Sequence, residues 1–292
     1  MAQRIEDHPQ QLTMDGSTRQ QKLLDESLEL LRIAEPKEGY YLATSFGKDS
    51  IATQRLCDEA GVRYDAHHNI TGIDPPELVY FGRRHYPDAE RHHSGTSMWA
   101  LIRRKKMPPM RHARYCCAGL KEHGGTGRVC VMGMRASESD RRAKSWGLAT
   151  TKGVRSDSPD FVRMLDNDDV RSNLQACAAR GTVVVSPLYK WCDADLWAYI
   201  KDRKLPCCEL YDQGFDRLGC IGCPMARRGG REREFDRWPG FKHLYIRAFD
   251  RLIEMGKFTQ YKSGEGLFDW WMSDVAQDKP LEGQIGFEEA LL

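Results

Sequence analysis

The segment YLATSFGKDS at residues 41–50 places a lysine, an aspartate and two serines where an apolar run stops. The apolar run predicts a buried strand, and Gly47 predicts a turn into a helix. A helix that starts after such a turn presents free backbone N–H groups and the positive end of its dipole. Ser45 and Ser50 add hydroxyl donors and Lys48 adds a positive charge, so the turn is typical of a phosphate site.

The same turn allows other interpretations. It differs from the P-loop GxxxxGK[ST], because the second glycine and its spacing are missing. Ser45 or Asp49 could simply cap the following helix. Asp49 is therefore either a ligand of Mg²⁺ or a residue that stabilises the helix start.

Ten cysteines form a second informative set, and some of them occur in groups. The motif Cys220-x-x-Cys223 is flanked by glycines and a proline, and such a turn can hold one metal ion or cluster with two thiolates. The tandem pair Cys116-Cys117 would complete four ligands. Neighbouring side chains rarely both reach one tetrahedral ion, so the tandem pair is unusual for zinc. Isolated cysteines such as Cys57 are expected to be small buried hydrophobic residues.

Strands and helices are expected to alternate along most of the chain. Strands are predicted at residues 40–44, 62–69, 129–134 and 183–187, and helices at 17–33, 49–60, 78–86 and 193–201. This alternation favours an α/β fold with a parallel sheet covered on both faces. The polar segment 142–180 is expected to be a long insertion or loop, and the aromatic-rich segments 235–255 and 268–272 a helical C-terminal part.

Composition narrows the protein class. The chain has 292 residues, of which 40% are hydrophobic and 29% charged, as in ordinary soluble proteins. It contains no apolar run of the roughly 18 residues that a membrane span needs. Residues 1–16 are polar and lack the apolar region of an export signal, so a cytoplasmic location without a membrane partner is expected.

Six segments resemble the PP-loop ATP pyrophosphatase superfamily and, within it, the phosphoadenosine-phosphosulfate (PAPS) reductase-like family. They follow the family's order: SFGKDS at 45–50, TGIDPPE at 71–77, RYCCAGLK at 114–121, GMRASESDR at 133–141, PLYKW at 187–191 and LYDQGFDRLGCIGCP at 210–224. The resemblance implies an adenine nucleotide alpha-hydrolase-like fold, a doubly wound and mostly parallel sheet flanked by helices, in residues 1–225. Residues 226–292 would form a helical C-terminal extension packed on this domain.

The resemblance also implies which residues bind the nucleotide. The SFGKDS turn, with Phe46 included, would hold the phosphates of ATP or another adenine nucleotide. Gly133 and Arg135 of the GMRASES segment would lie on the phosphate side, together with Arg141 as a further candidate. Lys48 would neutralise the leaving pyrophosphate, and Asp49 would help to hold Mg²⁺.

The cysteine groups have a counterpart in the same family. Adenylyl-sulfate reductases hold a [4Fe-4S] cluster with a Cys-Cys pair and a C-x-x-C motif. The resemblance therefore implies four cluster ligands, Cys116, Cys117, Cys220 and Cys223. Cys208 stands where the reductase pattern has an asparagine, so it is a reserve ligand.

One departure from the reductases changes the expected reaction. Those enzymes attack the substrate with a cysteine on a C-terminal tail, whereas the last cysteine here is Cys223. The complete SxGKDS motif is similar to that of PP-loop enzymes that adenylate an acceptor and release pyrophosphate. The leading interpretation is ATP-dependent sulfur insertion, with tRNA or DNA as a candidate acceptor and a sulfur donor or redox protein as partner. The alternatives are an adenylyl-sulfate or PAPS reductase that borrows its nucleophile and a non-catalytic nucleotide-binding iron–sulfur accessory protein.

Two basic runs provide the reason to consider nucleic acid, although the net charge is only +2. The first comprises residues 103–106 with Arg111 and Arg114, and precedes Cys116. The second comprises the arginines from Arg227 to Arg237, including Arg228 and Arg231, and follows Cys223. These runs predict either a polyanion contact near the cysteines or two ordinary solvated surfaces.

Overall fold

The computed structural model describes residues 17–122, 124–138, 143, 147–152, 163–164, 182–227 and 229–273. Arg141, Cys177, Arg228 and the polar segment 1–16 lie outside the described residues. The chain divides into two compact units built from interleaved segments. The first contains residues 1–68, 80–90 and 124–217, and the second contains residues 69–79, 91–123 and 218–292. The expected division between residues 225 and 226 remains a prediction.

A seven-stranded sheet has the order β3-β2-β1-β4-β7-β5-β6 among the described residues. Its parallel pairs are β1 with β2, β1 with β4, and β4 with β7, whereas β5 is antiparallel to both β7 and β6. The strands are β1 Tyr40–Ala43, β2 Tyr64–Ile70, β3 Glu90–His93, β4 Val129–Val131, β5 Ala149–Lys152, β6 Arg163–Met164 and β7 Thr182–Val185. The mostly parallel sheet flanked by helices confirms the predicted fold class.

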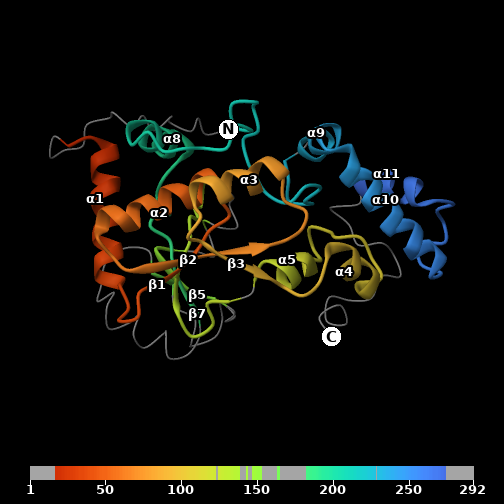
Figure 1. Cartoon of the computed structure of the whole chain (residues 1–292), viewed down its shortest axis with the longest axis horizontal. Helices are drawn as coiled ribbons and strands as arrows, with labels where there is room; N and C mark the ends of the chain where they lie inside the picture. Colours follow the sequence, from red (N-terminus) through yellow and green to blue (C-terminus); the bar gives the residue numbers. More distant parts are fainter. Residues whose placement is uncertain are drawn as a thin grey trace. The chain divides into compact units, whose positions relative to one another are not determined.

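Helices α1 (Arg19–Ala34), α2 (Lys48–Ala60) and α8 (Asp193–Asp202) belong to the first unit, and Figure 1 shows α1 and α2 next to each other. Helix α1 begins two residues later than the predicted helix at 17–33, and the Thr18 hydroxyl caps it by accepting a hydrogen bond from the Gln21 backbone N–H. Leu31, Leu42 and Leu56 are fully buried in the core that these helices share with the sheet. Burial of this apolar surface positions the start of α2 beside the end of β1.

Several elements differ from the prediction. Strands β5 and β6 lie inside the segment expected to be a loop or insertion, and β4 ends at Val131 rather than at residue 134. Strand β3 was not predicted, and neither were α4 (Met98–Lys105), α5 (Tyr115–Leu120) and the short 3₁₀ helix Ala136–Glu138. Helix α3 (Pro76–His85) matches the expected helix at 78–86 within two residues.

The C-terminal part is helical, as predicted, and forms three helices of the second unit: α9 Gly230–Arg237, α10 Pro239–Glu254 and α11 Gly264–Met272 (Figure 1). The segment 235–255 contains the end of α9 and all of α10, because Pro239 starts α10 and cannot continue α9. Tyr245, Phe249 and Trp271 are fully buried between them. Within the described residues, none of the helices combines the length and apolar character needed to cross a membrane.

Candidate functional site

The SFGKDS turn connects β1 to α2, as the sequence predicted. Gly47 is the N-cap of α2, so the N-cap residue itself supplies no capping side chain. Neither Ser45 nor Asp49 therefore has the capping role considered as the alternative. The Ser50 hydroxyl donates to the Gly47 carbonyl at 2.9 Å and accepts from the Ser45 N–H at 3.3 Å. These bonds fix the turn.

Phe46 anchors the turn to the core. Its φ of 57° is in the left-handed region, which aromatic residues rarely adopt. The ring is 2% exposed and packs on Gly82 of α3, where an added Cβ would lie 2.3 Å from the ring. Only the backbone of Phe46 can face a ligand, since its side chain is buried.

The segment 211–216 binds both the backbone nitrogen and the side-chain ammonium of Lys48. Its backbone N–H donates to the Tyr211 hydroxyl at 2.9 Å, and its Nζ donates to the Asp216 carbonyl at 2.8 Å. The Lys48 side chain is only 7% exposed. The Tyr211 oxygen thus occupies one hydrogen-bond position that a phosphate oxygen would use at a helix start.

Arg135 meets the same turn from the segment after β4. Its Nε lies 2.6 Å from an Asp49 carboxylate oxygen, and its Nη2 lies 2.9 Å from Asp193 on α8. Burial alone would lower the Arg135 pKa, but the two carboxylates raise it above its ordinary value. Arg135 is therefore a buried cation beside Lys48 rather than an exposed surface residue.

Gly133 allows the backbone of the segment after β4 to pass close to the first turn of α2. A Cβ at this position would lie 2.6 Å from the Asp49 carbonyl oxygen and 2.8 Å from the Thr53 hydroxyl. Its predicted place beside the turn is therefore explained by close packing against the first turn of α2.

Sequence reasoning missed Tyr211 and Asp193. Tyr211 lies within the quoted segment LYDQGF, and Asp193 is the second residue after PLYKW. These segments were used only as family markers, although the position of an acidic residue at the start of α8 was visible. What the sequence alone did not provide was their contact with Lys48 and Arg135.

The second unit contains both cysteine pairs of the predicted cluster site. Cys116 and Cys117 lie in the first turn of α5, while Cys220 and Cys223 lie in a turn closed by a 3.2 Å backbone hydrogen bond. A hydrogen bond to Cys117 and burial raise the pKa of Cys116, with smaller contributions from Cys223 and Cys220. The four thiols therefore interact electrostatically.

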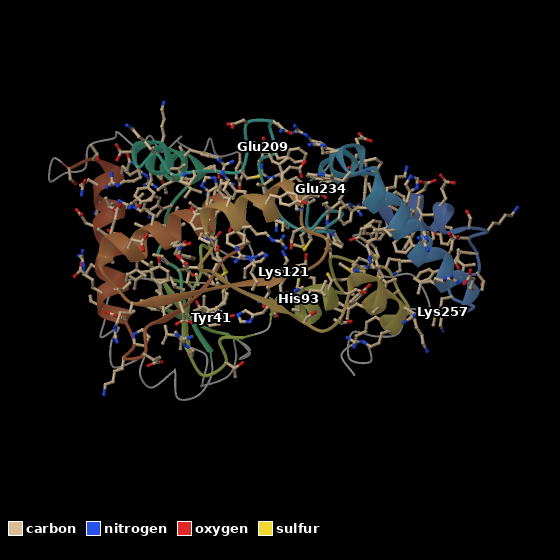
Figure 2. The ribbon with its side chains drawn as sticks, in the orientation of Figure 1. Tyr41, His93, Lys121, Glu209, Glu234 and Lys257 are labelled. Atoms are coloured by element: carbon tan, nitrogen blue, oxygen red, sulfur yellow. The ribbon has the colours of Figure 1, made fainter. Side chains whose placement is uncertain are left out.

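Charged groups surround these thiols. The Cys116 thiol and then the Arg114 guanidinium, 3.4 Å from the Cys117 sulfur, lower the pKa of Cys117. Burial raises the pKa of Cys220 to about 12, and Lys121 opposes that increase. Lys121 also pairs with Asp74 at 4.0 Å, and Figure 2 labels its side chain. Among Cys116, Cys117 and Cys220, Cys117 is therefore the thiol whose surroundings favour the thiolate.

The C-x-x-C turn is packed firmly into the second unit. Gly222 has a φ of 75°, and a Cβ there would lie 2.6 Å from the Phe235 ring. Its N–H donates to the Glu234 carboxylate at 2.7 Å, and Figure 2 labels Glu234. Cys208, the reserve ligand, belongs to the first unit and is 1% exposed; its ligand role remains a prediction.

Some residues of the basic runs have structural contacts. Arg111 donates to the Pro224 carbonyl at 2.9 Å, directly after the C-x-x-C turn. Arg231 is 6% exposed and donates to the carbonyls of Trp271 and Met272 at 3.0 Å. Arg237 pairs with Glu77 at 2.6 Å. Arg231 therefore cannot be part of an exposed polyanion surface, contrary to the grouping made from the sequence.

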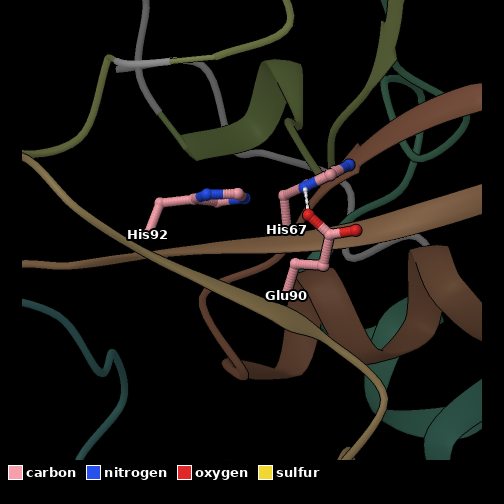
Figure 3. A group of neighbouring side chains, drawn as sticks. All are labelled: His67, Glu90 and His92. Atoms are coloured by element: carbon pink, nitrogen blue, oxygen red, sulfur yellow. Dashed lines mark ion pairs between the residues drawn. The ribbon is translucent and has the colours of Figure 1, made fainter.

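A separate cluster of charged and titratable side chains lies in the first unit and was not predicted. His67 Nδ1 lies 3.4 Å from a Glu90 carboxylate oxygen (Figure 3), and its Nε2 contacts Asp65. Arg128 binds both Asp65 oxygens at 2.6 Å. The Tyr41 ring stacks on His67 with a centroid separation of 3.9 Å. Hydrogen bonds from Arg128 and then from His67 hold the pKa of Asp65 below its ordinary value.

The family model that matches residues 39–226 is described as the phosphoadenosine phosphosulfate reductase domain. The chain belongs to this family. The match includes the turn, Gly133, Arg135 and both cysteine pairs, so the resemblance inferred from the six segments is confirmed.

Individual relatives match this chain over different lengths. An uncharacterised protein of Methanocaldococcus jannaschii is 26% identical over 80% of the chain and 46% of its own length. An adenosine 5'-phosphosulfate reductase of Oceanobacillus iheyensis is 33% identical over 34% of the chain and 37% of its own length. The chain thus spans less than half of the length of these curated relatives.

Among solved structures, the U34-tRNA thiolase of Methanococcus maripaludis with its [4Fe-4S] cluster is similar with a TM-score of 0.37. It is 12% identical, and the alignment covers 96% of this chain and 90% of that chain.

Proposed function

We propose that this PAPS reductase-like protein binds ATP at the start of α2, adenylates an acceptor and supports sulfur insertion at the activated position. The observation that carries the proposal is the start of α2, where a helix end with glycine as its N-cap meets the Lys48 and Arg135 side chains, which are 7% and 3% exposed. Two buried cations beside the N–H groups of a helix start suit a polyphosphate.

The reaction makes and breaks defined bonds. An acceptor oxygen forms a bond to the α-phosphorus of ATP, and the bond from that phosphorus to the oxygen bridging to the β-phosphate breaks. Pyrophosphate leaves with that electron pair, and a sulfur nucleophile then displaces AMP from the acceptor. Lys48, Arg135 and the N–H groups of the turn would stabilise the charge that develops on pyrophosphate.

The cysteine site fits the second half of the proposal. Cys116, Cys117, Cys220 and Cys223 would hold a [4Fe-4S] cluster, which would carry or activate sulfide when bound. Neighbouring side chains such as Cys116 and Cys117 rarely both reach one tetrahedral ion, and this tandem pair is the reason to favour a cluster over a single zinc ion.

A second candidate is reduction of a sulfonucleotide. It is favoured by the identity to adenosine 5'-phosphosulfate reductase, which is 33% over 100 residues. The same turn would then hold the phosphate of adenylyl sulfate, and a thiol from a partner would attack the sulfur.

The two candidates release different products. Protein purified without oxygen is incubated with ATP and tRNA or DNA, or with adenylyl sulfate and a thiol, and both pyrophosphate and sulfite are measured. Pyrophosphate release that requires nucleic acid supports sulfur insertion, whereas sulfite release supports the reductase.

Lys48→Ala tests the turn in the same assay. We expect turnover to fall by about 10²-fold or more, with a smaller change in nucleotide affinity, because Lys48 acts mainly on developing charge. Full turnover of this variant would contradict the role given to Lys48.

A further inference from the structure

Four charged side chains alternate around one point in the first unit. Arg135 contacts Asp49 at 2.6 Å and Asp193 at 2.9 Å. Lys48 Nζ lies 3.8 Å from Asp49 and 3.7 Å from Asp193. Each cation therefore contacts both carboxylates, and the formal charges of this ion quartet cancel.

The two cationic side chains are more deeply buried than the two carboxylates. The Lys48 and Arg135 side chains are 7% and 3% exposed, whereas those of Asp49 and Asp193 are 23% and 59% exposed. A buried cation is costly unless an anion stays beside it. The two cations thus need a negative partner in every state, while the carboxylates can reach solvent and other ligands.

A polyphosphate at the start of α2 would compete with these carboxylates. Its oxygens can replace Asp49 and Asp193 as partners of the buried cations. The displaced carboxylates would then repel the phosphates unless a cation comes with the nucleotide. Oxygen ligands of this kind suit Mg²⁺, which is commonly bound by one or two carboxylates together with phosphates.

We infer that Asp193, together with Asp49, compensates the charges of Lys48 and Arg135 in the nucleotide-free protein and couples nucleotide binding to a divalent cation. This inference rests on the proposed nucleotide site and adds Asp193 as a positioning residue. Metal-free nucleotide has to displace two carboxylates without compensation, so it binds weakly. Nucleotide with Mg²⁺ supplies a partner for every charge, so each ligand increases the affinity for the other.

The test compares affinities with and without metal. The full chain is titrated calorimetrically with α,β-methylene-ATP in MgCl₂ and, separately, in EDTA. In the wild type we expect Mg²⁺ to raise the affinity by about tenfold or more. In Asp193→Asn we expect the metal-free affinity to rise and the Mg²⁺ effect to shrink, because a competing negative charge is gone.

Two further variants separate charge from folding. Asp202→Asn makes the same change at the other end of α8, where Asp202 is 62% exposed and pairs with Arg203. Asp202→Asn should keep the wild-type Mg²⁺ effect. Asp193→Glu retains the negative charge and should therefore also keep the wild-type Mg²⁺ effect. Thermal melting in the absence of nucleotide checks that each variant is folded.

The outcomes distinguish the inference from the proposed function. An unchanged Mg²⁺ effect in folded Asp193→Asn overturns the inference, as does a loss of affinity of equal size in MgCl₂ and EDTA. Wild-type protein that binds the nucleotide analogue in neither buffer overturns the nucleotide site itself.

Discussion

The phenolic oxygen of Tyr211 lies 2.9 Å from the backbone nitrogen of Lys48, so a residue 163 positions downstream binds the first N–H of α2. Burial raises the pKa of Tyr211 above its ordinary value, so the hydroxyl is neutral at physiological pH. The Tyr211 ring also lies 5.7 Å from Lys48 Nζ and packs edge-on against Trp197. Tyr211 therefore stabilises the nucleotide-free turn at the position proposed for phosphate.

Tyr211→Phe removes this hydrogen bond and keeps the ring. We expect the free energy of unfolding to fall by about 1 kcal/mol, the usual net contribution of one hydrogen bond. Saturating pyrophosphate should reduce this difference, because a phosphate oxygen can then accept from the Lys48 N–H. Thermal melts with and without pyrophosphate measure both effects.

Tyr80→Phe is the matched control, since Tyr80 is 68% exposed on α3 and should melt like the wild type. A Tyr211→Phe defect that pyrophosphate leaves unchanged would mean that the two oxygens do not share one position.

The sequence predicted the turn but not its surroundings. An apolar run, a glycine and a helical segment are local signals, so β1, Gly47 and α2 could be read from about twenty residues. Asp193 and Tyr211 reach Lys48 only through the order of the sheet and the packing of α8, and no local pattern encodes that contact. The same holds for the ion pairs of Arg135, which lies 86 residues from Asp49.

The missed elements have a similar cause. Strand β5 is polar, and its pairing with β7 is what stabilises it as a strand. The break between α9 and α10 was accessible, because Pro239 signals a new helix start. Arg231 shows the opposite error: a charged residue in a basic run was assigned to the surface, yet it is 6% exposed and binds the end of α11.

The proposed cluster predicts a clear spectroscopic difference between two cysteine variants. Cys220→Ser removes a proposed ligand, and we expect protein purified without oxygen to lose its brown colour and most of its iron. Wild-type protein should contain about four irons and acid-labile sulfide. Iron and sulfide assays with an absorbance spectrum measure the outcome; stoichiometric zinc without iron in the wild type would contradict the cluster.

Cys192→Ser is a better control for this experiment than Cys57→Ser. Cys57 is fully buried in the core, so its replacement introduces a polar group there. Cys192 is the N-cap of α8, where serine is a favoured residue. Cys192→Ser should therefore fold normally and keep its iron.

Arg114 should control the reactivity of Cys117 in cluster-free protein. The Cys116 thiol and Arg114 lower the pKa of Cys117, so more of this cysteine is thiolate at neutral pH. Arg114→Ala raises that pKa, and the alkylation rate at pH 7 should fall several-fold. The difference should vanish at high pH, where the thiol ionises in both proteins. Iodoacetamide labelling followed by peptide mass spectrometry measures the rate at Cys117.

Arg103→Ala is the control for this change, because Arg103 is an exposed cation at the end of α4. It should leave the alkylation rate of Cys117 unchanged. An equal decrease in both variants would assign the effect to overall charge rather than to the contact between Arg114 and Cys117.

The basic run at the end of α4 is a candidate surface for a nucleic-acid acceptor. Arg103, Arg104 and Lys106 are exposed, and this helix belongs to the same unit as the four proposed cluster ligands. Binding of tRNA or DNA through phosphates releases counterions, so the affinity should fall steeply as salt increases. Changing these three residues together to alanine should flatten the salt dependence by roughly two to three units of its logarithmic slope.

Arg231 is left out of this variant, because its replacement would disturb the packing of α11 and would not remove an exposed charge. Filter binding or fluorescence anisotropy between about 50 and 200 mM salt measures the slope for wild type and variant. A matched control replaces Lys22, Arg32 and Lys37, which are exposed or half-exposed on or next to α1 in the other unit. Equal slopes for the two triple variants would show that only total charge matters. Absence of wild-type binding at about 50 mM salt would exclude a polymer acceptor at this surface and favour a small substrate, because a basic surface retains most of its attraction at low salt.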